Sequence, residues 1–178
     1  MFSTCPTIET ERLRLRPFRN EDHPVFASFY ADEATAGFLG GTCDAGAAWR
    51  LMAAYCGHWQ LRGFGPFAVA AKSTDKMIGY CGPWFPHAKP ERELIWGIVA
   101  SHQRQGFASE AAVAARRWAY THAGWPGAVS YIEPRNAASL GVARRLGATQ
   151  DGTVTIRGYE LNVMRHPSAE QVSVENAA

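Results

Sequence analysis

Hydrophobic and polar residues alternate in several short runs of this chain. Residues 8–16, Ile-Glu-Thr-Glu-Arg-Leu-Arg-Leu-Arg, place apolar and charged side chains on opposite faces, which predicts a strand with one face in water. Residues 93–99, Glu-Leu-Ile-Trp-Gly-Ile-Val, predict another strand. Further strands are expected at residues 65–71, 77–82, 128–132, 148–151 and 159–165.

Four helices are expected between these strands, from apolar side chains at helical spacing and from residues typical of helix ends. Asp44 and Asn136 are the expected N-caps of two of them, and Gly147 follows the last one at its C′ position. The interleaved strands and helices predict an α/β fold with a sheet of mixed direction. The predicted helices cover residues 22–31, 44–61, 107–123 and 136–146.

The organisation along the chain is simple. No internal repeat or linker divides the sequence, so we expect a single domain over residues 1–167. Residues 168–178 contain few side chains to bury, which predicts a flexible C-terminal tail.

The composition narrows the class of protein. Hydrophobic residues make up 47% of the 178, which is typical of a soluble globular domain. The net charge of +2 is small and the basic residues are scattered, so nucleic acid is not an expected partner. The four cysteines have no C-x-x-C spacing, so we expect no disulfide framework and no metal. With no leader pattern and no apolar run of membrane-spanning length, we expect a cytoplasmic protein without membrane contact.

The loop at residues 103–108, Gln-Arg-Gln-Gly-Phe-Ala, joins the predicted strand 93–99 to the predicted helix 107–123. Backbone N–H groups at a helix start lack intrahelical acceptors, and the helix dipole adds positive potential, so this loop is an expected phosphate site. Gly106 lets an anion approach the main chain closely. A Walker loop needs Gly-Lys-Ser/Thr and a dinucleotide fingerprint needs three glycines, and this loop fits neither motif.

The pattern that remains, Q/R-x-x-G-x-G/A, resembles the acyl-CoA pyrophosphate loop of the GNAT superfamily of N-acetyltransferases. The resemblance extends over about residues 8–167 and looks most like the branch that acetylates ribosomal-protein N-termini at alanine. It implies a mixed, mostly antiparallel twisted sheet of six to seven strands with about four helices on its faces. The other segments that carry it are residues 9–18, 78–82, 106–111, 136–140 and 164–167.

The resemblance implies acetyl-CoA as the co-substrate. The main-chain N–H groups of residues 104–109 would hold its pyrophosphate, and the Gln103 and Arg104 side chains would add donors. The strand end at residues 98–99 would pair with the pantetheine arm, and an N–H near Ile98 would stabilise the oxyanion. Asn136 would bond the pantetheine and cap its helix. The implied cofactor-binding residues are Ile98, Val99, Gln103, Arg104, Gln105, Gly106, Phe107, Ala108, Ser109 and Asn136.

Glu93 and Ser139 are the candidate catalytic residues. An amine is mostly protonated at neutral pH and must lose a proton before it attacks a thioester. The resemblance implies a base at the position of Glu93, and the alternative is a solvated charge at the strand edge. The resemblance would direct the Ser139 hydroxyl toward the departing thiolate, and the alternative is a bond to the carbonyl four residues earlier. Ala143 stands where many superfamily members have a general-acid tyrosine.

The expected function is transfer of an acetyl group from acetyl-CoA to a primary amine by direct attack in a ternary complex. The acceptor favoured by the resemblance is a protein N-terminus. Two alternatives stay open: a small-molecule amine acetyltransferase and a non-catalytic acyl-CoA-binding module. We also allow for a homodimer. The candidate acceptor-lining residues, each of which has a core or rim alternative, are Tyr30, Glu33, Phe38, Leu39, Trp84 and Phe85.

Overall fold

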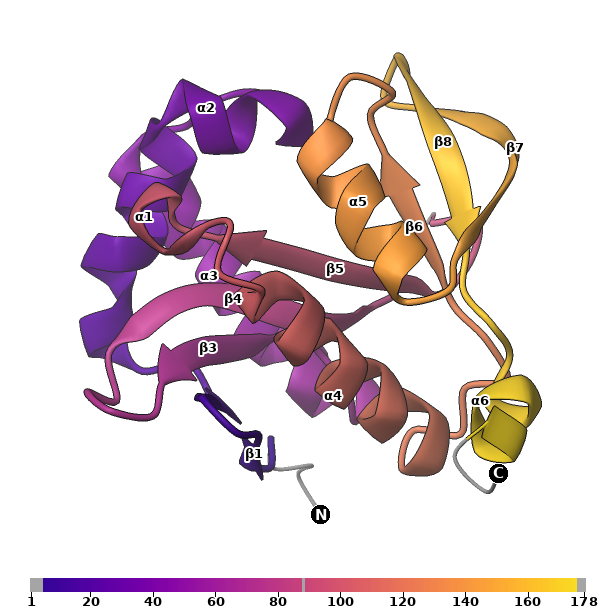
Figure 1. Ribbon diagram of the computed structural model, residues 1–178. Coiled ribbons are helices and arrows are strands. Elements are labelled where there is room, and N and C mark those ends of the chain that lie inside the picture. The colour runs from indigo at the N-terminus through magenta and orange to yellow at the C-terminus, as the bar shows by residue number, and fades with distance from the viewer. Residues whose placement is uncertain (1–4, 88, 176–178) are drawn as a thin grey trace.

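The computed structural model describes residues 5–87 and 89–175, and its centre is one eight-stranded sheet (Figure 1). The strands lie in the order β1-β2-β3-β4-β5-β6-β8-β7, and all neighbours are antiparallel except β5 and β6. The strands are β1 (Ile8–Glu9), β2 (Leu13–Arg16), β3 (Phe67–Ala71), β4 (Met77–Trp84), β5 (Glu93–Ile98), β6 (Val129–Ile132), β7 (Thr149–Ile156) and β8 (Tyr159–Arg165). The predicted mixed, mostly antiparallel sheet is confirmed.

The sheet has more strands than the six to seven expected, and one cause lies near the N-terminus. The single strand predicted over residues 8–16 is two strands that pair in antiparallel register, with Ile8 opposite Leu15. The chain reverses between them because the Thr10 N–H donates to the Leu13 carbonyl, while the Thr10 hydroxyl accepts from the Leu13 N–H. A threonine hydroxyl that bonds nearby main chain competes with extended pairing in this way.

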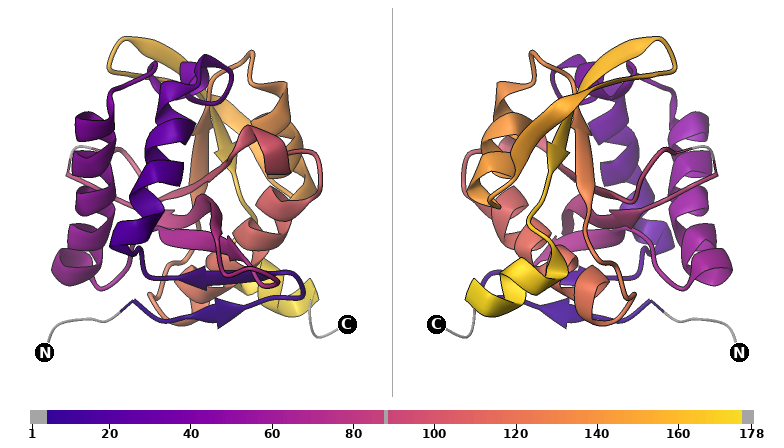
Figure 2. Two further views of the ribbon diagram at one scale, coloured as in Figure 1. Left: turned by 90° about the vertical axis from the view of Figure 1, so that its left-hand side faces the viewer. Right: turned by 90° about the vertical axis from the view of Figure 1, so that its right-hand side faces the viewer.

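Helices cover both faces of the sheet. Figure 2 shows α1 and α3 on one side of the strands and α4 and α5 on the other. The Asp44 carboxylate caps α3 by accepting from the Ala47 N–H at 2.7 Å, as the sequence predicted. The helices are α1 (His23–Ala31), α2 (Glu33–Ala36), α3 (Ala45–Arg62), α4 (Phe107–Thr121), α5 (Ala137–Arg145) and α6 (Ala169–Glu175), and short 3-10 turns are η1 (Asn20–Asp22), η2 (Gly37–Leu39) and η3 (Ala100–His102).

Two of these helices were not expected. The four-residue α2 follows α1 directly and is capped by Asp32. Helix α6 lies within the predicted tail, and its Ala169 and Val172 pack against the core on the α4 face, so residues 169–175 are ordered by apolar burial. Residues 176–178 of the predicted tail lie outside the described residues.

The core consists of separate apolar clusters on the two faces of the sheet. On the α4 face, Ala111, Ala115 and Ala119 have no exposed surface, and their small side chains let α4 approach β4 and β5 closely. On the opposite face, rings from α1, α3 and β4 form an aromatic cluster whose members include Phe26, Tyr30, Tyr55 and Tyr80.

The parallel pair β5–β6 opens like a V. Over the described residues these strands have one register pair, Glu93 opposite Val129. Beyond it the strands diverge, with α5 beside the opening (Figure 1). Residues on the far arm of β5 therefore face a gap in the sheet rather than a neighbouring strand, and the predicted site residues gather around this gap. No helix among the residues described here is long and apolar enough to cross a membrane.

Candidate active site

The start of α4 presents a run of free backbone donors. Within the described residues, no protein acceptor is found for the N–H groups of residues 104–109, and no side chain caps the helix. The first helical bond is from the Glu110 N–H to the Gly106 carbonyl. Left-handed backbone at Arg104 (φ 61°) and Gly106 (φ 82°) directs the loop into the helix. These N–H groups, at the positive end of a 15-residue helix, fit a phosphate or pyrophosphate group.

Arg12 holds this loop from a distant part of the chain. Its guanidinium donates to the Gln105 carbonyl at 2.9 Å and pairs with the Glu110 carboxylate at 2.7 Å. The same group lies 4.6 Å from the centre of the Phe107 ring. Sequence reasoning missed Arg12 and Glu110, because nothing local connects two residues so far apart in the chain.

The hydrogen bonds of β5 show which residues face the V-shaped gap. The Val99 N–H donates to the Ile78 carbonyl of β4 at 2.9 Å. Because backbone groups alternate between the two sides of a strand, Ile98 and Trp96 direct their N–H groups toward the gap. Of the two residues predicted to pair with a pantetheine arm, Ile98 therefore faces the gap, whereas Val99 uses its N–H inside the sheet. Sequence reasoning missed Trp96, which the period of two along a strand places on the same side as Ile98.

Gln103 has a different partner from the one expected. Its side-chain amide donates to the Ile98 carbonyl at 2.9 Å, which ties the loop to the end of β5. This amide hydrogen is thus used within the protein and positions the loop, while the N–H groups of residues 104–109 have no acceptor among the described residues.

Glu93 lies at the vertex of the V and is buried, with 6% of its surface exposed. The alternative of a solvated edge charge is therefore wrong. Burial raises the pKa of this carboxyl, while the Lys89 ammonium, 2.7 Å away, and the Tyr131 backbone N–H oppose the rise. A carboxylate with a raised pKa is suited to accepting a proton near neutral pH.

The start of α5 lies across the gap from β5. The Asn136 carboxamide oxygen caps α5 by accepting from the Ser139 N–H at 3.0 Å, as predicted. The Ser139 hydroxyl is half-buried and has no hydrogen bond within the described residues, so the alternative bond to the carbonyl four residues earlier is not present. Ala143 is fully buried in a cluster that also packs against Trp96, so α5 and β5 are in contact at this point beside the gap.

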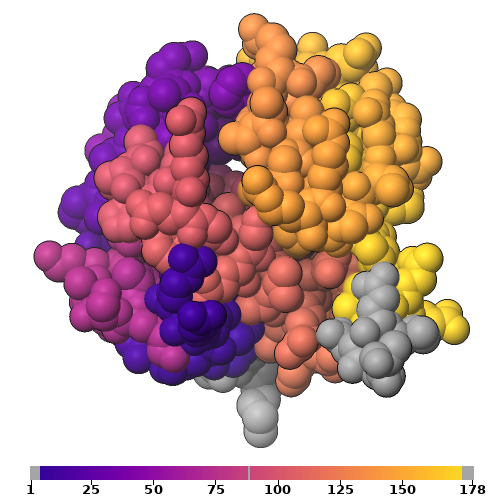
Figure 3. Space-filling view, in the orientation of Figure 1, coloured from indigo at the N-terminus to yellow at the C-terminus, as the bar shows by residue number. Residues whose placement is uncertain are grey.

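The candidate acceptor residues divide into core and surface. Tyr30 is buried, and its hydroxyl bonds those of Tyr80 at 3.0 Å and Tyr55 at 3.4 Å. Trp84 packs on Tyr55 and His58. Glu33 and Leu39 are exposed, while Phe38 and Phe85 are half-buried. In Figure 3 a hollow opens where the purple, salmon and orange parts of the surface meet, between the first helices, the loop before α4 and the α5 region.

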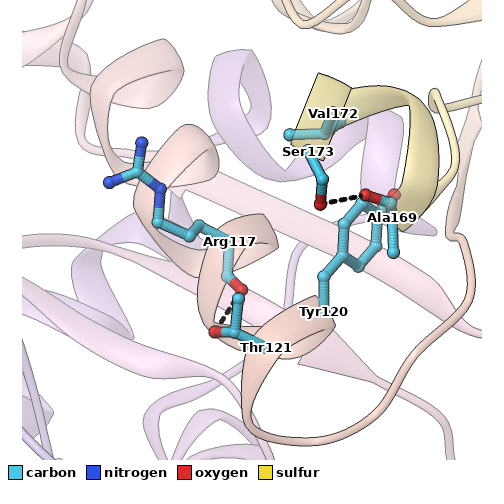
Figure 4. Close-up of a pocket in the computed structure, with 6 residues that line it drawn as sticks. All are labelled: Arg117, Tyr120, Thr121, Ala169, Val172 and Ser173. Atoms are coloured by element: carbon cyan, nitrogen blue, oxygen red, sulfur yellow. Dashed lines mark hydrogen bonds between the residues drawn. The ribbon is translucent and has the colours of Figure 1, made fainter. Parts of the chain in front are cut away.

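A second depression lies elsewhere. A groove of about 450 Å³ runs between the C-terminal half of α4 and α6 (Figure 4). It is remote from the loop because it lies at the other end of α4, and its one buried polar group, the Tyr120 hydroxyl, donates to the Pro167 carbonyl. No group of three or more metal-ligating side chains occurs among the described residues. The groove is lined by Arg117, Tyr120, Thr121, Ala169, Val172 and Ser173.

Comparison with known proteins agrees with this geometry. The acetyltransferase (GNAT) domain family matches residues 12–149. An uncharacterised N-acetyltransferase, p20 of Bacillus licheniformis, is 28% identical over 158 residues, which are 86% of this chain and 87% of that protein. The crystal structure of an acetyltransferase from Agrobacterium tumefaciens is 33% identical, covers 94% of this chain and 98% of its own, and has a TM-score of 0.84.

A ribosomal-protein-S5-alanine acetyltransferase from Vibrio fischeri has the same fold, with a TM-score of 0.73 over 93% of this chain and 97% of its own. Its sequence identity is 16%, so the likeness concerns the fold alone.

Proposed function

The chain belongs to the acetyltransferase (GNAT) family, and from this premise we propose that it transfers an acetyl group from acetyl-CoA to a primary amine. The transfer takes place by direct attack in a ternary complex. Within the family, the chain most resembles the RimJ/RimL-like branch, which acetylates ribosomal-protein N-termini at alanine. The observation that carries this proposal is the run of six N–H groups at residues 104–109 that have no acceptor among the described residues, next to the open edge of β5.

The residues around the gap fit the parts of acetyl-CoA. The loop N–H groups suit the pyrophosphate, since residues 104–106 are exposed, residues 107–109 are half-buried and all six lie at the positive end of α4. Arg12 and Arg104 add positive charge beside the loop. The backbone edge at Trp96 and Ile98 suits the amide groups of pantetheine, in the manner of an added strand. The amide hydrogens of Asn136, for which the described residues offer no acceptor, suit the same arm from the α5 side.

Acetyl-CoA supplies an acetyl group activated as a thioester. Glu93 takes the proton from the ammonium of the acceptor, directly or through water, which frees the lone pair for attack on the thioester carbonyl. A gap-facing N–H near Ile98 donates to the carbonyl oxygen as charge develops on it. The new C–N bond forms as the C–S bond breaks, and the attacking nitrogen gives up its second proton to water or to the relay that protonates the thiolate.

The departing thiolate needs a proton, and Ser139 is the proposed donor or relay. Its hydroxyl is free of protein partners within the described part of the chain, so it can donate without breaking an existing bond. Ala143, one turn further along α5, is a buried methyl and carries no proton. A serine is a weak acid, so this relay contributes less than a tyrosine would.

We propose a protein N-terminus as the acceptor. The fold likeness to the Vibrio fischeri ribosomal-protein-S5-alanine acetyltransferase supports this choice, as does the exposed Glu33 of α2, whose charge attracts a cationic amine.

Calorimetric titration with acetyl-CoA, followed by a thiol-release assay, tests the proposal. The acceptor panel contains peptides with free N-termini, polyamines, amino acids and aminoglycosides. Turnover on N-terminal peptides supports the full proposal, and turnover on small amines alone corrects the acceptor. Binding without any turnover favours a non-catalytic acyl-CoA-binding module, and absence of binding contradicts the proposal altogether.

A further inference from the structure

The V-shaped gap has a sharply defined vertex. The Val129 N–H donates to the Arg92 carbonyl at 3.0 Å, which sets the parallel register of Glu93 with Val129. If the ladder continued in this register, the next pair would be Ile95 and Tyr131. That pair would use the Leu94 carbonyl as acceptor and the Tyr131 N–H as donor.

Buried side chains lie beside both of those backbone groups. The Ser130 hydroxyl donates to the Leu94 carbonyl at 2.6 Å. The Tyr131 N–H lies near the Glu93 carboxyl and lowers its pKa. Since an unpaired buried backbone group is costly, the Ser130 hydroxyl lets the ladder stop here by satisfying the carbonyl that it leaves.

His166 fixes the direction of the Ser130 hydroxyl. Its Nε2 lies 3.0 Å from the Ser130 oxygen, and both side chains are 3% exposed. The single hydroxyl hydrogen of Ser130 is used by Leu94, so Nε2 must carry a hydrogen and donate to the serine oxygen. The order of donation is therefore His166 to Ser130 to Leu94.

We propose that Ser130 is a positioning residue that ends the β5–β6 ladder and so holds open the slot for the pantetheine arm. This inference rests on the proposed function and assigns a role to a side chain that touches neither the acetyl group nor the acceptor. When the hydroxyl is removed, the Leu94 carbonyl becomes available to the Tyr131 N–H. The strands can then pair one step further, and Trp96 turns its N–H toward Tyr131 instead of toward the slot.

The first test is the affinity for CoA, measured by calorimetry so that no turnover is needed. Ser130→Ala should bind CoA about three- to ten-fold more weakly than the unchanged protein, the range that one lost hydrogen bond represents. Ser173→Ala is the matched control, because it also removes a hydroxyl that donates to a carbonyl, that of Ala169 at 2.8 Å in α6. Ser173→Ala should bind CoA normally. Equal affinity of Ser130→Ala and the unchanged protein overturns the proposal.

The second test uses amide hydrogen exchange in the ligand-free protein and is independent of acetyl transfer. Exchange at the Trp96 amide should slow in Ser130→Ala, because a longer ladder gives this N–H an acceptor. An unchanged rate at Trp96 overturns the proposal even if CoA affinity falls. If the unchanged protein binds no CoA, the proposed function fails, and the exchange measurement alone decides whether Ser130 ends the ladder. If Ser130→Ala does not fold, Ser130→Cys replaces it, because cysteine is close to serine in size but is a poor hydrogen-bond donor. Ser130→Cys is expected to lower the CoA affinity and to slow exchange at the Trp96 amide.

Discussion

Arg12 and Glu110 form an ion pair 2.7 Å long that joins the turn between β1 and β2 to the first turn of α4. The Thr10 hydroxyl donates to the same carboxylate, and the Arg12 backbone N–H does so as well. Through these bonds the N-terminal hairpin braces the helix end whose N–H groups face outward. The loop is thereby held in place without a ligand, which would reduce the ordering cost of the proposed anion binding.

Arg12→Ala should weaken CoA binding about three- to ten-fold, since it removes the bond to the Gln105 carbonyl and a positive charge beside the loop. The loss of stability should be small, below about 1 kcal/mol, because the arginine side chain is 44% exposed. Calorimetry and thermal unfolding measure the two effects. Arg14→Ala is the control, since Arg14 pairs with Glu9 and Asp75 away from the loop. If both variants lose CoA affinity equally, the effect comes from the loss of one positive charge and not from the contact between Arg12 and the loop.

Both the backbone conformation and the proposed pyrophosphate site favour glycine at position 106. Its φ of 82° is left-handed, and an added Cβ would lie 3.3 Å from the Arg12 guanidinium. Gly106→Ala should cost about 1–2 kcal/mol of stability from this conformation. Gly106→Glu should abolish CoA binding, because it adds a negative charge where the pyrophosphate is proposed to lie. A folded Gly106→Glu protein, checked by circular dichroism, that binds CoA normally would show that the loop assignment is wrong.

The sequence predicted best what depends on neighbouring residues. The loop at 103–108 and the start of α4 were found because a glycine between a strand-like run and an alanine-rich helix is a local signal. Asp44 and Asn136 were found as helix caps for the same reason. These features need no knowledge of how distant segments pack.

What the sequence did not predict depends on contacts between distant segments. Arg12 and Glu110 are separated by 98 positions, and Ser130 and Leu94 by 36, so no spacing rule connects them. Helix α6 looks like a polar tail, yet it is held by Ala169 and Val172 on the core. Glu93 looks like one charge among neighbours in the sequence, and only the fold buries it. Tertiary packing decided each of these cases.

Glu93→Gln should lower turnover mainly at lower pH. Burial raises the pKa of this carboxyl, and only its deprotonated form accepts a proton, so wild-type activity should fall as the pH drops through that raised pKa. At high pH the free amine needs no base, and the variant should approach the unchanged protein. The substitution changes neither the loop N–H groups nor the gap-facing edge of β5, so CoA affinity should persist. Profiles of kcat/KM against pH check this, and parallel profiles for both proteins would remove Glu93 from the proton pathway.

His166 should make the protein less stable in acid. Burial, with a smaller contribution from Arg116, lowers the pKa of His166 from 6.5 to about 3. Between these values the unfolded chain binds a proton that the folded chain does not, so stability falls as the pH falls from 6.5 toward 3. The contribution reaches about 1.4 kcal/mol per pH unit. Denaturant titrations at several pH values give the free energy of unfolding as a function of pH. Between pH 6.5 and 3 this free energy should fall less steeply for His166→Gln than for the unchanged protein. His122→Gln, at an exposed position, should show the same dependence on pH as the unchanged protein. Equal slopes in all three proteins would mean that His166 titrates normally.

Ser139→Ala separates the proposed proton relay from cofactor binding. The hydroxyl has no protein partner within the described residues, so its removal should change stability by less than about 0.5 kcal/mol. Turnover should fall several-fold, on the order of ten-fold, because the departing thiolate loses a positioned donor, while the KM for acetyl-CoA should stay the same.

Asn136→Ala provides the contrast. It removes the α5 cap, which should cost about 1 kcal/mol, and it should raise the KM for acetyl-CoA. Thiol-release kinetics and thermal unfolding of both variants measure these differences. If Ser139→Ala turns over at the unchanged rate, the proton reaches the thiolate from solvent and not through α5.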